Sequence, residues 1–196
     1  AGRHRVRRRR RQNTVAAIIE FAEPVSAFAV KPDMFSIEDR TIKTVKVTAT
    51  QDINATAADG KFVVIELDPT NETSVVYSAG VDEAPQLVVN LTSPLPLVSG
   101  KTATPGEKAV ISTRVKNLVV DDFRQFRFTD PVTGLLLDYN LYIPKDYDPK
   151  QSYPMVMFMH DAGVTGSNPR RTLQQGLGAI SFASPQDQAK HPSFVL

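Results

Sequence analysis

The sequence predicts an all-β sandwich followed by a smaller unit of strands and a helix. Three observations lead to this prediction. Between Val15 and Leu118, short runs rich in Val, Ile and Thr recur between turn residues. Two runs near residues 123–143 then flank a turn that contains Pro and Gly, as in an antiparallel hairpin. Residues 154–159 are apolar at consecutive positions, which is typical of a strand buried on both faces.

Composition narrows the class of protein. The 196 residues are 41% hydrophobic and 22% charged, which is ordinary for a globular chain that buries a core. No run of 18 or more apolar residues occurs, so no membrane-spanning helix is expected. The chain has no cysteine. Disulfides, thiolate metal sites and a Cys nucleophile are therefore excluded.

The net charge of +2 comes from the N-terminus, because seven arginines and no acidic residue lie within residues 1–11. Without those seven, 16 basic residues face 21 acidic ones. Residues 1–14 are predicted to be a disordered, Arg-rich tail, since arginines repel one another and no aromatic residue is interleaved. The alternative is an arm that binds nucleic acid or anionic lipid through counterion release.

Glu20 interrupts the only apolar stretch that could serve as a signal peptide.

Five strands are predicted for the sandwich. They cover residues 15–21, 42–49, 61–67, 86–91 and 109–116. In the second of these, Val45, Val47 and Ala49 alternate with polar residues, which predicts one buried and one solvated face. Asp59-Gly60 is predicted to form a turn because glycine tolerates positive φ. Residues 93–106 hold three prolines and two glycines and are predicted to be loop.

The second unit is predicted to begin with a hairpin of residues 123–128 and 135–143. The second strand places Leu137, Tyr139, Leu141 and Ile143 on one face, and Pro144 follows it. The buried strand 154–159 comes next.

A helix is then predicted over roughly residues 169–183. Asn168 is a good N-cap, Pro169 suits the first helical position, and Leu173, Leu177 and Ile180 recur at helical spacing. Ser193 to Leu196 would begin a further buried strand.

Three stretches of the second unit resemble a known family. They are residues 130–144 (DPVTGLLLDYNLYIP), residues 153–163 (YPMVMFMHDAG) and residues 175–192, which include Gln175-Gly176-Leu177-Gly178-Ala179 and end in Ala189-Lys190-His191-Pro192. In these stretches the chain is similar to bacterial esterases known as "predicted peptidases", which are prolyl-oligopeptidase-like α/β-hydrolases. These esterases often carry an N-terminal Ig-like domain. The resemblance therefore implies an Ig-like β-sandwich domain over residues 15–120. Residues 121–196 would be the N-terminal, incomplete portion of an α/β-hydrolase catalytic domain.

The resemblance also implies a site. In this family, backbone amides of the loop after the third strand stabilise an oxyanion, and here that loop spans residues 160–163. Ala162 and Gly163 are the expected donors, with Asp161 as the next candidate. His160 is expected to be a buried residue that orders this loop, because triads of this fold place the histidine last. His191 is expected to order a loop as well.

The function implied is ester hydrolysis by a serine carboxylesterase acting on a small-molecule ester. No Gly-x-Ser-x-Gly occurs in the sequence, so the nucleophile is expected beyond this chain, which would be inactive alone. The parent would be an exported or cell-surface bacterial protein, although no clear signal peptide is present. No cofactor and no metal site are expected.

Two other functions remain open. The Ig-like domain could be a non-catalytic binding or interaction module, or the Arg tail could make the chain a nucleic-acid or membrane adaptor. If no further strand covers residues 154–159, their exposed edge is also expected to permit self-association.

Overall fold

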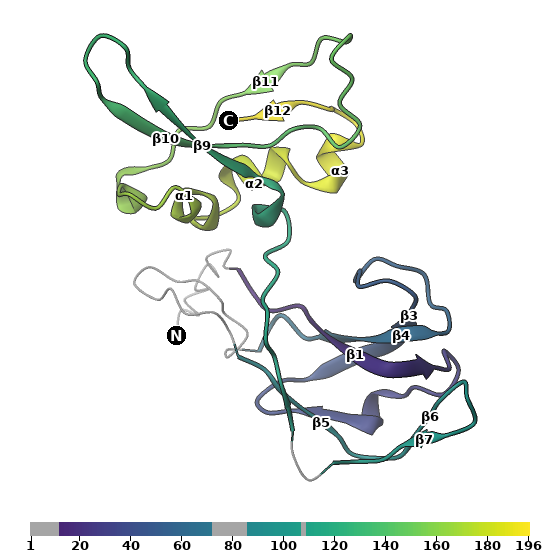
Figure 1. Cartoon of the computed structure of the whole chain (residues 1–196). Coiled ribbons are helices and arrows are strands. Elements are labelled where there is room, and N and C mark those ends of the chain that lie inside the picture. The colour runs from purple at the N-terminus through teal and green to yellow at the C-terminus, as the bar shows by residue number, and fades with distance from the viewer. Residues whose placement is uncertain (1–11, 72–85, 107–108) are drawn as a thin grey trace, which may run out of the picture. The chain divides into compact units, whose positions relative to one another are not determined.

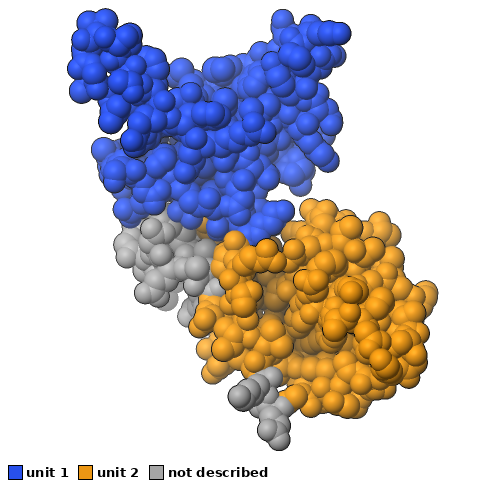
Figure 2. Space-filling view, viewed as in Figure 1, with its two compact units in different colours: residues 1–11, 116–196 blue, residues 12–115 orange. Residues whose placement is uncertain are grey.

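The computed structural model describes residues 12–71, 86–106 and 109–196. Two compact units are present, residues 12–115 and residues 116–196, and Figure 2 colours them separately. Each unit has its own hydrophobic core. The predicted tail lies almost entirely outside the described residues, whereas Gln12 to Thr14 are placed and half-buried. Among the described residues, no helix has both the length and the apolar character needed to cross a bilayer.

The first unit is built from short antiparallel strands (Figure 1). Its elements are β1 (Ala16–Val25), the 3₁₀ helix η1 (Pro32–Met34), β2 (Phe35–Ile37), β3 (Ile42–Thr48), β4 (Gly60–Leu67), β5 (Val88–Leu91), β6 (Leu95–Pro96), β7 (Thr102–Ala103) and β8 (Val110–Ile111). One sheet has the order β1-β4-β3, a second has the order β2-β5-β8, and β6 pairs with β7.

All five predicted strands are confirmed, although the run 109–116 forms only the two-residue β8. Strand β2 was not predicted. The prediction of loop over residues 93–106 is wrong in part, because β6 and β7 form a small hairpin there.

The core of the first unit is made by alternate residues of both sheets. In the central strand β4, Val63, Ile65 and Leu67 are at most 2% exposed. They belong to the same core cluster as Phe35 of β2 and Val89 of β5. Burying a side chain of this size stabilises the fold by about 1.5–3 kcal/mol. Two antiparallel sheets that share one apolar core form the predicted β-sandwich.

Gly60 is needed for a close backbone approach rather than for a positive φ. Its φ is not among the positive values of the chain, so the predicted reason for this glycine is wrong. A Cβ at this position would lie 2.1 Å from the carbonyl oxygen of Thr48. Thr48 is fully buried beneath this contact, and its hydroxyl donates to the carbonyl of Thr50 at 2.8 Å. The predicted alternation of β3 therefore ends at Thr48, and Ala49 is exposed.

The second unit contains a hairpin, a parallel strand pair and three short helices. Its elements are the 3₁₀ helix η3 (Val120–Asp122), β9 (Arg124–Thr129), β10 (Leu136–Leu141), β11 (Met155–Val156), the 3₁₀ turn η4 (Ala162–Val164), α1 (Arg170–Gln174), α2 (Gly178–Phe182), α3 (Pro185–Gln188) and β12 (Phe194–Val195). The predicted hairpin is confirmed as β9 paired with β10, and the predicted final strand as β12.

Strand β12 lies between β11 and the residue that follows β10. Val195 pairs in parallel with Val156 of β11. On its other side Val195 forms an antiparallel bridge with Tyr142. Figure 1 shows the three helices on one side of these strands.

The turn between β9 and β10 is held by Asp130. Its carboxylate accepts the N–H of Val132 at 2.8 Å, and this hydrogen bond lowers the pKa of Asp130 below its ordinary value. Gly134 then adopts φ +71 and donates its N–H to the carbonyl of Asp130. Glycine is favoured at this position because a side chain would crowd the backbone.

The predicted single helix over residues 169–183 is wrong, because the segment is divided into α1 and α2. Pro169 rather than the predicted Asn168 occupies the N-cap position of α1, although Oδ1 of Asn168 accepts the N–H of Arg170 at 3.1 Å. The interruption contains Gly176 and is followed by Gly178, the first residue of α2, and each glycine inside a helix costs about 1 kcal/mol relative to alanine. Tertiary packing explains Gly178: a Cβ there would lie 2.3 Å from the ring of Phe158.

Residues 154–159 are not buried on both faces, so that prediction is wrong. Met155 is 58% exposed and Met157 is 66% exposed. Within the described residues, hydrogen bonds form along one edge of this segment: Val156 accepts the N–H of Leu196 at 2.8 Å, and Phe158 donates to Leu196 at 2.7 Å. Within the described parts of the chain, the Met157 amide has no acceptor. The run 154–159 is therefore apolar in sequence but largely exposed to solvent in the structure.

We predict that residues 12–116 fold alone and that Ile65→Ala lowers their free energy of unfolding by about 3 kcal/mol, because it opens a cavity in the core. Ile111→Ala is the matched control. Its side chain is 51% exposed in a strand, so its loss should cost less than about 1 kcal/mol. Urea denaturation of the three polypeptides measures both values. A non-cooperative transition, or equal losses at the two positions, would contradict the prediction.

Candidate functional site

The loop that follows β11 is closed by a short 3₁₀ turn. Asp161 precedes η4 and its Oδ1 accepts the N–H of Gly163 at 2.8 Å. Val164, at the end of the turn, is 8% exposed, so this end of the loop is buried. Small residues at 162 and 163 leave the backbone open to solvent, because neither position carries a side chain larger than a methyl group.

The three amides expected to bind an oxyanion are in two different states. In the described part of the chain nothing accepts a hydrogen bond from the amides of Asp161 and Ala162. The Gly163 amide is engaged by the Asp161 carboxylate. Two of the three predicted donors are therefore available to an external acceptor. Gly163 becomes available only when the Asp161 side chain turns away, and the role of all three remains a prediction.

His160 contacts the loop but is not buried as predicted. Its side chain is exposed, and its Nδ1 lies 2.7 Å from the carbonyl oxygen of Asp161, within donating distance for a protonated nitrogen. His191 lies three residues beyond the end of α3, and its Nδ1 is 3.4 Å from Oδ1 of Asp187. Each histidine therefore contacts its own neighbouring loop or helix.

Solvent reaches the whole candidate loop. Asp161, Ala162 and Gly163 are all exposed. Backbone dipoles stabilise a developing charge far more strongly where water is excluded, because the local dielectric constant is low there. In this conformation the loop has the hydrogen-bond donors of an oxyanion site. It lacks the water-excluding surroundings in which such donors stabilise a negative charge strongly.

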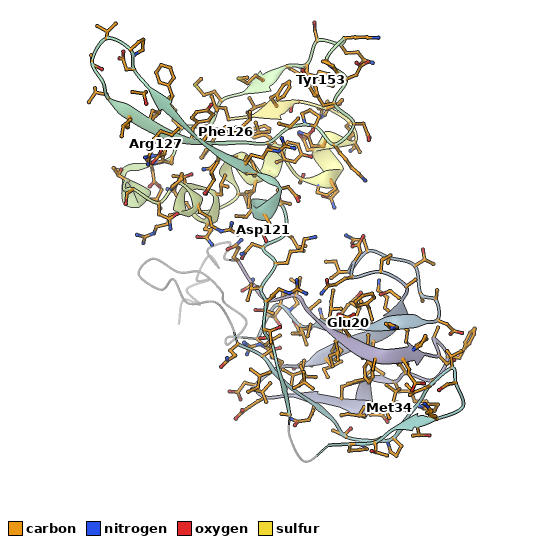
Figure 3. All side chains as sticks on the ribbon, viewed as in Figure 1. Glu20, Met34, Asp121, Phe126, Arg127 and Tyr153 are labelled. Atoms are coloured by element: carbon orange, nitrogen blue, oxygen red, sulfur yellow. The ribbon has the colours of Figure 1, made fainter. Side chains whose placement is uncertain are left out.

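One surface hollow of the second unit was not predicted from the sequence. It is lined by Gln125, Phe126, Arg127, Asp138, Ser167 and Pro169, of which Phe126 and Arg127 are labelled in Figure 3. Arg127 binds Asp138 through two hydrogen bonds of 2.6 and 2.9 Å. The guanidinium lowers the pKa of the Asp138 carboxyl, and the carboxylate raises the pKa of Arg127. Because the charges neutralise one another, the hollow offers little net charge to a ligand. The sequence signal that could have revealed this ion pair is the opposite charge of Arg127 and Asp138, which lie on the two paired strands of the hairpin.

No group of three or more His, Asp or Glu side chains is placed to hold a metal ion within the residues that the structure describes. The carboxylate of Asp121, at the start of the second unit, has a structural role. Asp121 accepts the N–H of Asn117 at 2.7 Å and forms an ion pair with Arg170 at the start of α1.

The first unit, a β-sandwich, can be compared with known protein families. Residues 12–116 match the family model of the esterase Ig-like N-terminal domain, and the chain belongs to this family.

A solved structure described as a thermostable esterase is similar to the chain, with 30% sequence identity and a TM-score of 0.81. The match covers 93% of the chain and 52% of that protein, so the chain spans about half the length of that esterase. A search of curated proteins gave no match.

We predict that Asp161→Ala releases the Gly163 amide. Loss of a hydrogen bond to a charged acceptor should speed solvent exchange of this amide by about tenfold, because such a bond contributes about 1.5 kcal/mol. Solvent-exchange NMR measures the rate directly. Asp187→Ala is the matched control, since Asp187 lies in α3 and should leave Gly163 unchanged. Equal Gly163 exchange rates in the Asp161→Ala variant and the unaltered chain would contradict the assigned hydrogen bond.

Proposed function

We propose that the second unit supplies the oxyanion-binding loop of a serine carboxylesterase. One observation carries the proposal: β11 leads directly into a loop with two exposed backbone amides that have no acceptor in the described part of the chain. Membership of the esterase family and the similarity to a thermostable esterase support it. We further propose that residues 15–120 are an Ig-like domain and that residues 121–196 belong to a hydrolase catalytic domain.

In the proposed reaction a serine hydroxyl attacks the acyl carbon of a small-molecule ester while a histidine removes its proton. The carbonyl oxygen becomes an oxyanion, and the amides of Ala162 and Asp161 donate hydrogen bonds to it. Gly163 can join them once its bond to the Asp161 carboxylate is broken. Collapse of the intermediate expels the alcohol, which takes the proton, and water then hydrolyses the acyl-enzyme.

The serine, its base and the acid that orients the base are proposed to lie outside these 196 residues. The sequence contains no Gly-x-Ser-x-Gly, and both His160 and His191 contact their own local segments. A nucleophile in this fold sits on a strand-to-helix turn of that pattern. Reading the genomic sequence beyond codon 196 tests this part of the proposal: a Gly-x-Ser-x-Gly followed by an acidic residue and a histidine is expected. An uninterrupted unrelated sequence would contradict it.

We predict that the 196-residue chain alone does not hydrolyse a short-chain aryl ester at an enzyme-like rate. The solvent-exposed loop and the missing nucleophile both lead to this expectation. The assay is paired with a serine-directed phosphonate, and boiled chain serves as the control. Stoichiometric labelling of a single serine in the native chain would show that the nucleophile is already present.

The role of the loop is tested in an enzyme extended by the missing sequence. Ala162→Pro removes the amide hydrogen at the first position of η4, where proline is compatible with the backbone. Loss of one oxyanion donor should lower kcat by roughly 10²–10³-fold. Ala162→Gly keeps the donor and is the matched control. An unchanged kcat in the folded Ala162→Pro enzyme would assign the oxyanion to other groups.

A further inference from the structure

Residues 113–116, which we call the connector, join the two units and belong to the core of neither. The core cluster of the first unit is built from residues between Ala17 and Ala103, and that of the second unit from residues between Val119 and Val195. The division between the units falls within the connector. A break in this segment would therefore remove no contact from either core.

The first unit fixes the backbone as far as Ser112. The Ser112 N–H donates to the carbonyl oxygen of Leu87 at 2.8 Å, and the Ser112 hydroxyl accepts the N–H of Leu87 at 2.9 Å. These hydrogen bonds extend the pairing of β8 with β5 by one residue. The sandwich therefore holds the chain up to the residue before the connector.

The second unit fixes the backbone from Asn117 onward. The Asn117 N–H donates to Oδ2 of Asp121 at 2.7 Å, and the Asp121 N–H donates to the carbonyl oxygen of Asn117 at 2.9 Å. Between these residues Val119 has φ +66, a conformation that β-branched residues rarely adopt, so its surroundings hold it against its own preference. An ion pair with Arg170 of α1 secures the same carboxylate.

The connector itself has no such support. Thr113, Arg114, Val115 and Lys116 are all exposed and lie outside helices and strands. No described residue exchanges a backbone hydrogen bond with them, and neither basic side chain forms an ion pair with a described residue. Exposed backbone without hydrogen-bond partners is a preferred site of proteolytic nicking, because a protease can bind it without first unfolding a domain.

We propose that the Arg114–Val115 bond is a processing site for an endopeptidase that cuts after arginine or lysine. The bond lies at the centre of the connector, and the Arg114 guanidinium supplies the positive charge that an acidic specificity pocket binds. Hydrolysis breaks the C–N bond. Water supplies the hydroxyl of a new carboxyl group on Arg114 and a hydrogen to the new amino group of Val115. The sandwich and the second unit then become separate polypeptides.

Lys116 is the poorer of the two basic positions in the connector. The amide that follows it, that of Asn117, donates to the Asp121 carboxylate and must be released before a protease can hold the bond. Breaking a hydrogen bond to a charged acceptor should slow the cut by about tenfold. Arg114 is followed by an amide that has no acceptor among the described residues.

Other exposed basic residues lie in backbone that is hydrogen-bonded. Lys61 is exposed but belongs to β4, which pairs with β1 on one side and β3 on the other. The amide that follows Lys150 donates to the carbonyl oxygen of Asp148 at 3.0 Å, and the amide that follows Lys190 donates to that of Asp187 at 2.8 Å. Cutting at these positions requires local opening of the structure first.

Limited trypsin digestion of the full 196-residue chain, followed by mass spectrometry of the fragments, tests the proposal. The first separation of the two units should occur after Arg114, and the bond after Lys61 should be cut at least about 100-fold more slowly. Arg114→Gln should slow the separation by about tenfold, because Lys116 is then the remaining site in the connector. Lys61→Gln is the matched control and should leave the rate unchanged. The released sandwich should keep its melting temperature, because the cut removes no core contact.

Several outcomes would overturn the proposal. They are a first cut after Lys108 or within the second unit, equal rates for Arg114→Gln and the unaltered chain, and a lowered melting temperature of the released sandwich. Cuts within residues 1–11 only shorten the N-terminal fragment and leave its new C-terminus unchanged. The same digestion of the enzyme extended by the missing sequence should give the same cut. Protection of the Arg114–Val115 bond in that longer enzyme would also overturn the proposal.

Discussion

Pairing of Val195 on both of its sides organises the second unit. Its N–H donates to Tyr142 at 3.2 Å, its carbonyl accepts the N–H of Tyr142 at 2.8 Å, and its other neighbour is Val156. The side chain is fully buried in the cluster beneath the helices. Without this strand the hairpin and β11 would have no common neighbour, and the loop that begins at His160 would lose its fixed starting point.

The two faces of the resulting sheet follow from how α1 begins. Asn140 is 8% exposed, and its amide donates to the carbonyl of Pro169 at 2.8 Å and to the hydroxyl of Thr172 at 3.1 Å. Burying an amide without partners is costly, so these hydrogen bonds fix which side of β10 meets the helices. Tyr142 follows on the same side and packs against Phe123, and its burial raises the pKa of its hydroxyl. The apolar residues that alternate with them are therefore directed to the opposite side of the strand.

Local sequence signals predicted most strands and the hairpin, because alternation and turn residues act over a few positions. Features set by distant contacts could not be predicted in the same way. Position 178 has no room for a side chain because the ring of Phe158, twenty residues earlier in the chain, lies against it. The apolar run 154–159 predicted burial, yet burial depends on what covers a strand. For the candidate site, the sequence indicated the loop but not the bond between the Asp161 carboxylate and the Gly163 amide.

Hydrogen exchange along residues 155–159 and 194–196 tests most directly whether β12 holds this unit together. In monomeric chain at low concentration, the amides of Phe158, Val195 and Leu196 should be protected, because each donates to a paired strand or to the residues that extend it. The Met157 amide between them should exchange near the rate of an unstructured peptide. Slow exchange at Met157 would reveal a further strand on that edge. Unprotected Val195 and Leu196, with Val64 and Ile65 of the sandwich still protected, would contradict the account.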